Sequence, residues 1–252
     1  MTNDPNRNLQ RWFQLLEDEE LPRETRQIVS EQLAFFVDAV NDRDENMMFA
    51  SVQTLTEAAI SAGLKSLAED ATIVYAEFTA DPIHQAFALT NVATWRFSAG
   101  DVVGAEQPLG SAHSIFEQHD HAEGLSRTLT ISGDIQRSRG LPHEATVTYR
   151  SALLRAQSDS RRATIAARLV ESILDELDLS ALNEAINLWM RLAVATHDRD
   201  SLKAVITRVA NIGTFLARSG VALGAGLHGY AVACCREHGF DPISTCGSLD
   251  GA

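Results

Sequence analysis

The sequence predicts an all-α fold, and three observations carry this prediction. Apolar residues recur at steps of three and four along most of the chain, the spacing of one face of an amphipathic helix. Glycines and prolines mostly separate these runs instead of interrupting them. The third observation is an internal repeat, which decides architecture before any single motif does. The alternation typical of β-strands is weak throughout.

The repeat has a constant step of 40 residues. Gly100, Gly140, Ser180 and Gly220 occupy one register, and each lies between two helical runs. The second run of each unit carries a small residue five positions further on: Ala105, Ala145, Ala185 and Ala225. A glycine lets the chain leave a helix through a positive φ, and small residues let two helices approach closely. The pattern therefore predicts helical hairpins that stack on their neighbours.

Taken in order, the helices are expected at residues 8–20, 22–40, 45–62 and 66–79, followed by two helices in each 40-residue unit. Pro22, Pro82 and Pro142 fall at expected helix starts, where proline is favoured. Pro108 is the exception, because it falls inside a helical run and is predicted to kink or distort it.

Each unit carries, in this order, a small residue, a turn glycine, an alanine, an aromatic residue and a second alanine. This order and spacing resemble the pattern of the tetratricopeptide repeat family. Units here span 40 residues instead of 34, as in some bacterial members. Ile173, Ser180 and Gly229 depart from the pattern. The resemblance implies a right-handed α-α superhelix, or solenoid, of about six antiparallel helix pairs. Its expected parts are N-terminal capping helices (1–45), repeats over 46–239 (a degenerate unit 46–80, then about 82–119, 122–159, 162–199 and 202–239) and a disordered tail (240–252).

Composition narrows the function classes. The formal net charge is −13, and residues 1–80 hold 15 acidic against 6 basic side chains. Such a surface repels phosphate backbones and anionic lipids, so neither nucleic acid nor membrane is an expected partner. No apolar run is long enough to span a membrane, and the start lacks the pattern of a signal peptide. Three cysteines without ligand spacing indicate reduced thiols, and we expect a cytoplasmic protein.

Few motifs suggest chemistry. Residues 224–229 read GxGxxG, but a dinucleotide site needs a strand before this motif and none is expected, so close helix packing is favoured. His113 and Glu117 lie one helical turn apart and could present two metal ligands, but a solvated helix C-terminus is the favoured explanation. No nucleophile motif is present. The expectation is a protein that is not an enzyme and has no cofactor and no metal.

In families with this repeat, partners bind in the concave groove lined by the first helix of each unit. Carried over by register, the expected partner-binding residues are Phe87, Asn91, Thr94, Phe97, Arg127, Thr130, Asp134, Arg137, Thr207, Asn211 and Thr214. Members that clamp a carboxylate carry several basic residues in the groove, and Arg127 is the only clear match here.

The leading hypothesis is a non-catalytic scaffold that binds a protein or peptide in this groove. The alternative is a regulatory sensor that binds a small peptide or metabolite and acts through a protein partner. An enzyme would need a site that sequence spacing does not reveal. Self-association through the C-terminal hairpin is compatible with either hypothesis, because the ends of a solenoid expose apolar faces unless they are capped.

Overall fold

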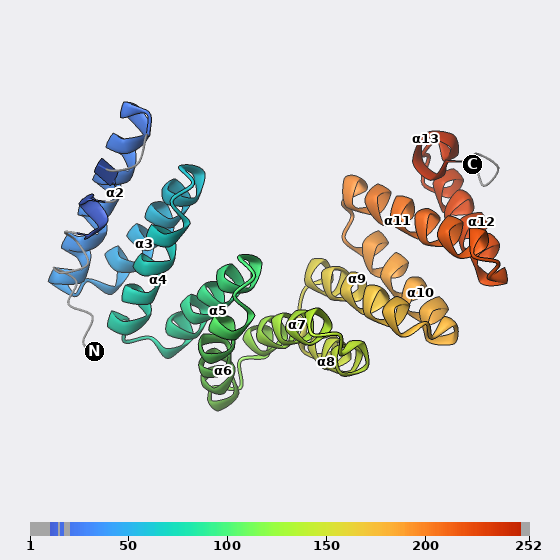
Figure 1. Cartoon of the computed structure of the whole chain (residues 1–252), viewed down its shortest axis with the longest axis horizontal. Helices are drawn as coiled ribbons and strands as arrows, with labels where there is room; N and C mark the ends of the chain where they lie inside the picture. The colour runs from blue at the N-terminus through green and yellow to red at the C-terminus, as the bar shows by residue number, and fades with distance from the viewer. Residues whose placement is uncertain (1–10, 15, 18–20, 248–252) are drawn as a thin grey trace. The chain divides into compact units, whose positions relative to one another are not determined.

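The computed structural model describes residues 11–14, 16–17 and 21–247 (Figure 1). Over these residues the chain is helical apart from short connections, and it contains no strand. Residues 11–14 and 16–17 are helical, and the rest of the predicted first helix lies outside the described residues. The labelled helices are α2 (Arg23–Asp42), α3 (Glu45–Ser61), α4 (Lys65–Phe78), α5 (Pro82–Ser98), α6 (Val102–Gln118), α7 (Ala122–Ser138), α8 (Pro142–Arg155), α9 (Asp159–Glu176), α10 (Leu179–Ala195), α11 (Arg199–Arg218), α12 (Ala222–Glu237) and α13 (Pro242–Cys246).

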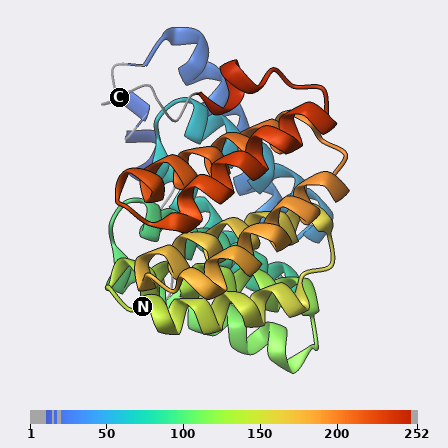
Figure 2. The same cartoon turned by 90° about the vertical axis from the view of Figure 1, so that its right-hand side faces the viewer.

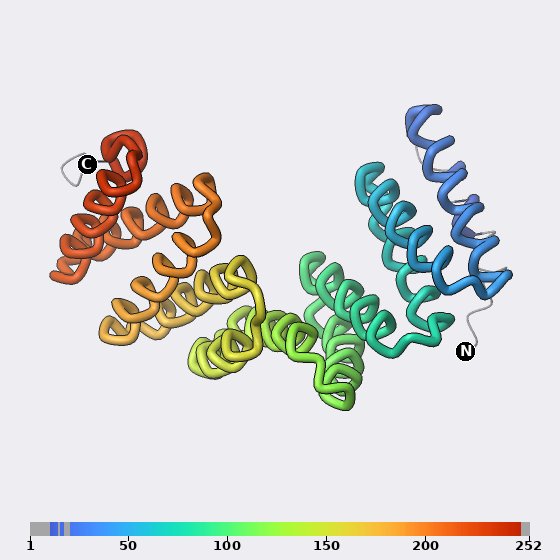
Figure 3. Tube along the Cα trace, turned by 180° about the vertical axis from the view of Figure 1, so that it is seen from behind, coloured from blue at the N-terminus to red at the C-terminus, as the bar shows by residue number. Residues whose placement is uncertain are grey.

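Helices that follow one another in sequence pack against one another, as in the pairs α5 with α6 and α11 with α12. Figures 2 and 3 show the same succession of helices joined by short turns. The predicted all-α class and the packing of neighbouring helices in pairs are confirmed. The chain divides into two compact units, residues 1–131 and 132–252, with the boundary inside α7. Each unit is described by itself below.

The predicted turn glycines have the backbone conformation that the repeat requires. Gly100, Gly140 and Gly220 have φ values of 86°, 73° and 78°, so each chain reversal uses the left-handed region. After α5, the amides of Gly100 and Asp101 donate back to the carbonyls of Phe97 and Arg96, both at 2.9 Å. These bonds satisfy carbonyls that the helix end would leave unpaired.

The prediction of a turn at Ser180 is wrong. Ser180 lies in the first turn of α10, and the chain reverses earlier, at Leu177, which has a φ of 57°. Asp178 then caps α10 by accepting from the amides of Ser180 and Ala181, both at 3.1 Å. Because this unit lacks a glycine, a leucine adopts the left-handed conformation there, and its side chain is 71% exposed.

Within the first unit, α6 continues through Pro108. A proline has no amide hydrogen, so the carbonyl of Gly104, four residues earlier, has no helical partner. The Arg96 guanidinium on α5 donates to that carbonyl at 3.0 Å. The same side chain pairs with the Glu69 carboxylate on α4 at 2.7 Å. Arg96 thus links three helices and replaces the hydrogen bond that Pro108 removes.

The core of the first unit begins close to its N-terminal end. Trp12 and Leu16 are buried, together with apolar side chains of α2, α3 and α4. The Trp12 indole nitrogen donates to Asp70 on α4 at 3.2 Å. Trp12 is therefore held by both burial and a hydrogen bond, as buried tryptophans usually are.

In the second unit, α11 and α12 pack backbone against backbone. A Cβ added to Gly213 would lie 2.6 Å from the amide nitrogen of His228, and one added to Gly224 would lie 2.5 Å from the carbonyl oxygen of Gly213. The GxGxxG segment therefore serves close helix packing. Gly224 is the small residue of α12 that contacts α11. The repeat pattern predicted Ala225 for this role, but Ala225 is exposed.

The chain beyond residue 240 does not match the predicted disordered tail. Residues 242–246 form α13, which is capped by the Asp241 side chain and packs against α11 and α12. Thr245 and Cys246 are buried there. Residues 248–252 lie outside the described residues. No helix in the described part of the chain is long and apolar enough to cross a membrane.

Candidate binding pocket

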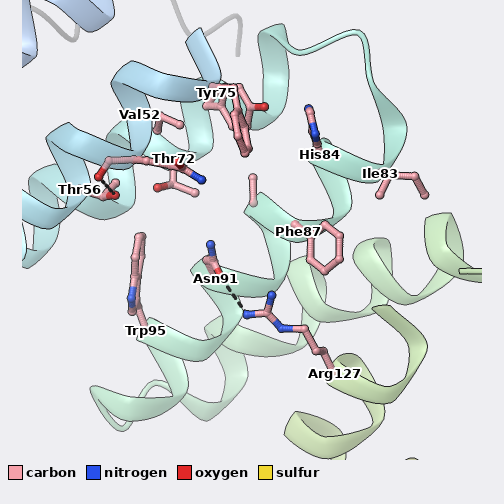
Figure 4. A pocket seen from close by; sticks show the side chains of 13 residues that line it. Val52, Thr56, Thr72, Tyr75, Ile83, His84, Phe87, Asn91, Trp95 and Arg127 are labelled. Carbon is pink, nitrogen blue, oxygen red and sulfur yellow. Dashed lines mark hydrogen bonds between the residues drawn. The ribbon is translucent and has the colours of Figure 1, made fainter. Parts of the chain in front are cut away.

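The first unit contains a cavity of about 410 Å³ between α3, α4, α5 and the start of α7 (Figure 4). Volumes of this size are typical of ligand sites. Most of its wall is apolar or aromatic, with a few amide, hydroxyl and cationic groups. The lining residues are Phe49, Val52, Gln53, Thr56, Thr72, Tyr75, Ile83, His84, Phe87, Ala88, Asn91, Trp95 and Arg127.

Helix α5 supplies one whole side of the pocket. Phe87, Asn91 and Trp95 are spaced four residues apart, so they lie along one face of this helix. The helix begins where Asp81 accepts hydrogen bonds from the amides of Ile83 and His84, at 2.8 and 3.2 Å. Pro82 at the first helical position fixes the start of the helix further.

Aromatic contacts hold the opposite walls in place. Phe49 on α3 stacks on the His84 ring, with the ring centroids 4.7 Å apart and the planes 12° apart. The Tyr75 ring is tilted against Phe49 at 6.4 Å. Burial raises the pKa of the Tyr75 phenol above its ordinary value, so this hydroxyl stays protonated at neutral pH. Phe87 packs edge-on against Phe116 at 4.9 Å.

The polar side of the pocket consists of Asn91 and Arg127. An Arg127 guanidinium nitrogen donates to Asn91 Oδ1 at 3.4 Å, drawn as a dashed line in Figure 4. The same guanidinium lies over the Phe87 ring, 5.3 Å from its centroid. A guanidinium is planar and carries five N–H donors, so it can contact an amide oxygen and an aromatic face at the same time. Among the described lining residues Arg127 is the only arginine, and none is a lysine, aspartate or glutamate.

Three of the predicted partner-binding residues meet in this pocket: Phe87, Asn91 and Arg127. Two further predictions on α5 do not line it. Thr94 is exposed and its hydroxyl donates to the Thr90 carbonyl at 2.8 Å, while Phe97 is half-buried and, two residues after Trp95, lies on the other side of α5. Thr130 on α7 is buried, and its hydroxyl donates to the Ser126 carbonyl at 2.7 Å.

The predicted residues of the second unit are not among those that line this pocket. Asp134 accepts from the Tyr149 hydroxyl at 2.7 Å and pairs with the Arg168 guanidinium at 2.8 Å. Arg137 pairs with Glu171 and Asp175, both at 2.6 Å. Both side chains are thus engaged in ion pairs that connect α7 to α9.

Thr207 and Asn211 line an open hollow on α11, and Thr214 is half-buried on the same helix. The Thr207 hydroxyl donates to the Lys203 carbonyl at 2.9 Å. A partner-binding role for these three residues stays a prediction, since the hollow is bounded by side chains of this one helix.

Sequence reasoning missed the walls supplied by α3 and α4. Phe49 and Gln53 lie beside the apolar stripe of α3, which includes Met48 and Val52. An aromatic residue next to a complete stripe is a signal that could have identified this wall. Trp95 was missed for a simpler reason, since the chosen register placed Thr94 in the groove, and Thr94 lies one residue away.

His113, which the sequence offered as a candidate metal ligand, and the nearby His121 are engaged in protein contacts. His113 Nδ1 lies 2.9 Å from the Thr128 hydroxyl oxygen, and that hydroxyl donates to the Leu125 carbonyl. His121 Nδ1 accepts from the Gly124 amide at 3.0 Å. Within the described residues, no group of three or more His, Cys, Asp or Glu side chains is arranged to hold a metal ion.

The fold and the pocket together define an all-α protein of paired helices with one aromatic-walled site in its first unit. No protein-family model matches the sequence, and no curated protein matches it either.

Proposed function

We propose that the chain is a non-catalytic binding protein whose pocket receives a segment of a protein or peptide. The single observation that carries this proposal is the composition of the pocket wall. Phe49, Phe87 and Trp95 provide apolar surface, and Asn91 and Arg127 provide hydrogen-bond donors on one side. Aromatic and arginine side chains contribute most to protein recognition.

The expected occupant is an extended segment with one large apolar side chain. That side chain would enter between Trp95 and Phe87, and an oxygen of the same segment, either a backbone carbonyl or a neighbouring carboxylate, would accept from Asn91 and Arg127. An oxygen is favoured next to the anchor because the polar side of the lining consists of the Asn91 amide and the Arg127 guanidinium. The tetratricopeptide-like repeat pattern is consistent with this mode of binding.

The polar groups of the pocket support binding more than catalysis. The Thr56 and Thr72 hydroxyls donate to carbonyls of their own helices, at 3.0 and 2.9 Å. His84 stacks on Phe49, and its Nδ1 lies 3.8 Å from Asp81. Among the described residues of the wall, no serine, cysteine or lysine stands beside this histidine.

A peptide selection tests the proposal. A library displayed on phage is selected on the full chain and then tested against the Asn91→Ala/Arg127→Glu double variant. We expect enriched peptides that share a large apolar residue and lose at least tenfold in affinity for the double variant. The matched control is Thr207→Ala/Asn211→Ala on α11, which should bind the same peptides unchanged. Equal affinity for the parent and the Asn91/Arg127 variant would refute the assignment of the pocket.

A regulatory sensor for a small ligand is the second candidate, and the cavity volume favours it. At about 410 Å³ the pocket can enclose a metabolite without any attached chain. A thermal-shift screen against a metabolite library distinguishes the two functions. Stabilisation by a compound, lost in Asn91→Ala/Arg127→Glu, would support the sensor and displace the peptide proposal.

A further inference from the structure

Two buried thiols face each other at the C-terminal end of the second unit. Cys235 lies on α12 and Cys246 on α13, and their Sγ atoms are 3.3 Å apart. Cys235 is fully buried and Cys246 is 6% exposed. Both are free thiols. Nothing in the proposed binding function uses them.

We propose that Cys235 and Cys246 form a redox modification site, at which a peroxide converts the two thiols into an intramolecular disulfide that fixes α13 to α12.

The geometry requires only a small movement. A disulfide has a sulfur–sulfur distance of about 2.05 Å, so the two atoms must approach by roughly 1.2 Å. Helix α13 has only five residues and joins α12 through Gly239, which has a φ of 68°. A segment this short, connected through a glycine, can shift by that amount more readily than a long helix can.

The third cysteine is excluded by its position on the helix. Cys234 precedes Cys235 on α12, and neighbours on a helix point about 100° apart. The Cys234 thiol has a hydrogen bond with Tyr230, one turn earlier on the same helix, whereas Cys235 is the thiol in contact with Cys246. Cys246 is also held toward α12 from its backbone, because the His228 Nε2–H donates to the Cys246 carbonyl at 3.3 Å.

The chemistry balances with hydrogen peroxide as the oxidant. One thiolate attacks a peroxide oxygen, the O–O bond breaks, and hydroxide leaves and is protonated to water, which gives a sulfenic acid. The second thiol sulfur then attacks the sulfenic sulfur, the S–O bond breaks, and a second water leaves. The two sulfurs are oxidised by two electrons in total, and the peroxide is reduced to two waters. Thiol reductants reverse the reaction through a mixed disulfide.

Burial sets the rate of the first step. Desolvation raises the pKa of the Cys246 thiol to about 12, so little thiolate exists at neutral pH while α13 is docked. Opening of the short helix exposes the thiol, and re-docking then brings the two sulfurs together. The expected behaviour is slow oxidation of the folded chain followed by fast closure of the disulfide, without accumulation of sulfenic acid.

Mass spectrometry of the full chain tests the proposal. Reduced protein is freed of reductant, treated with dilute hydrogen peroxide, alkylated and digested with trypsin. Cleavage after Arg236 separates Cys234 and Cys235 from Cys246, so the disulfide joins peptides 219–236 and 237–252. We expect this linked pair, a monomeric chain on a non-reducing gel, one remaining free thiol and full reversal by a reductant.

Cys234→Ser is the matched control, since it should still give the linked pair, whereas Cys235→Ser and Cys246→Ser should abolish it. Three free thiols after peroxide treatment of the folded parent chain would overturn the proposal. So would a linked pair that survives in Cys235→Ser. Because the parent chain is itself assayed, a variant that fails to fold does not decide the outcome. Amide exchange in residues 241–247 supplies an independent readout and should slow on oxidation, because the disulfide stops α13 from leaving α12.

Discussion

Arg96 donates a hydrogen bond to the Gly104 carbonyl, the group that Pro108 leaves without a helical partner. This relationship predicts coupling between two residues that lie on different helices. The substitution Arg96→Ala should lower the unfolding free energy more in the parent chain than in a chain that already carries Pro108→Ala. In the second background the amide of the new alanine restores the helical hydrogen bond to the Gly104 carbonyl, so the Arg96 contact is no longer needed there. We expect a coupling free energy of about 1.5–3 kcal/mol, the range for hydrogen bonds to charged groups.

Urea denaturation of the parent, both single variants and the double variant measures this coupling. The ion pair of Arg96 with Glu69 cancels in the cycle, because it is lost equally in both backgrounds. Strictly additive effects would show that the Gly104 contact contributes nothing.

Leu177 should tolerate, and benefit from, replacement by glycine. Its φ is 57° and its side chain is 71% exposed, so Leu177→Gly removes strain and little buried surface. We expect a gain of about 1 kcal/mol in unfolding free energy. The control is the reverse type of substitution, Gly100→Ala. The added Cβ would meet no atom within 4 Å, but the φ of 86° strains any residue with a side chain. That variant should lose about 1 kcal/mol, and a loss in Leu177→Gly would contradict the account.

Two glycines of α12 should respond to alanine with opposite signs. A Cβ at Gly224 would overlap the backbone of α11, while a Cβ at Gly226 meets open space. Gly224→Ala is expected to cost roughly 1–3 kcal/mol through overpacking. Gly226→Ala should stabilise by about 0.5–1 kcal/mol, because alanine favours a helix over glycine. Thermal unfolding followed by circular dichroism distinguishes them, and equal shifts would show that the close contact is absent in solution.

The Asp134 carboxylate should matter more than either of its partners. Asp134→Ala leaves the Arg168 charge and the buried Tyr149 hydroxyl unpaired, so we expect a loss of about 2–4 kcal/mol. Tyr149→Phe removes only one neutral donor and should cost about 1 kcal/mol. Chemical denaturation measures both. A larger loss in Tyr149→Phe than in Asp134→Ala would indicate that ring packing, and not the carboxylate, organises this cluster.

The sequence allowed the helices and most turns to be predicted, because apolar spacing and turn glycines act over a few residues. Phe87, Asn91 and Arg127 were identified by their register within the repeat, although Thr94 was chosen in place of Trp95. The ion pairs that Asp134 and Arg137 each make with residues of α9 were not predicted. Their charged partners lie 34 to 38 residues further along the chain, and contacts of that range depend on how α7 and α9 pack. The wall of Phe49 and His84 depends in the same way on the packing of α3 against α5.

Trp95 gives the pocket a native fluorophore. The chain has three tryptophans, and Trp12 and Trp189 are buried while Trp95 is half-buried in the pocket wall. A ligand that removes water from Trp95 changes the emission of this indole and leaves the other two unaffected. Occupancy of the site can therefore be followed by intrinsic emission from unlabelled protein, and a Trp95→Phe chain provides the reference emission of the other two tryptophans.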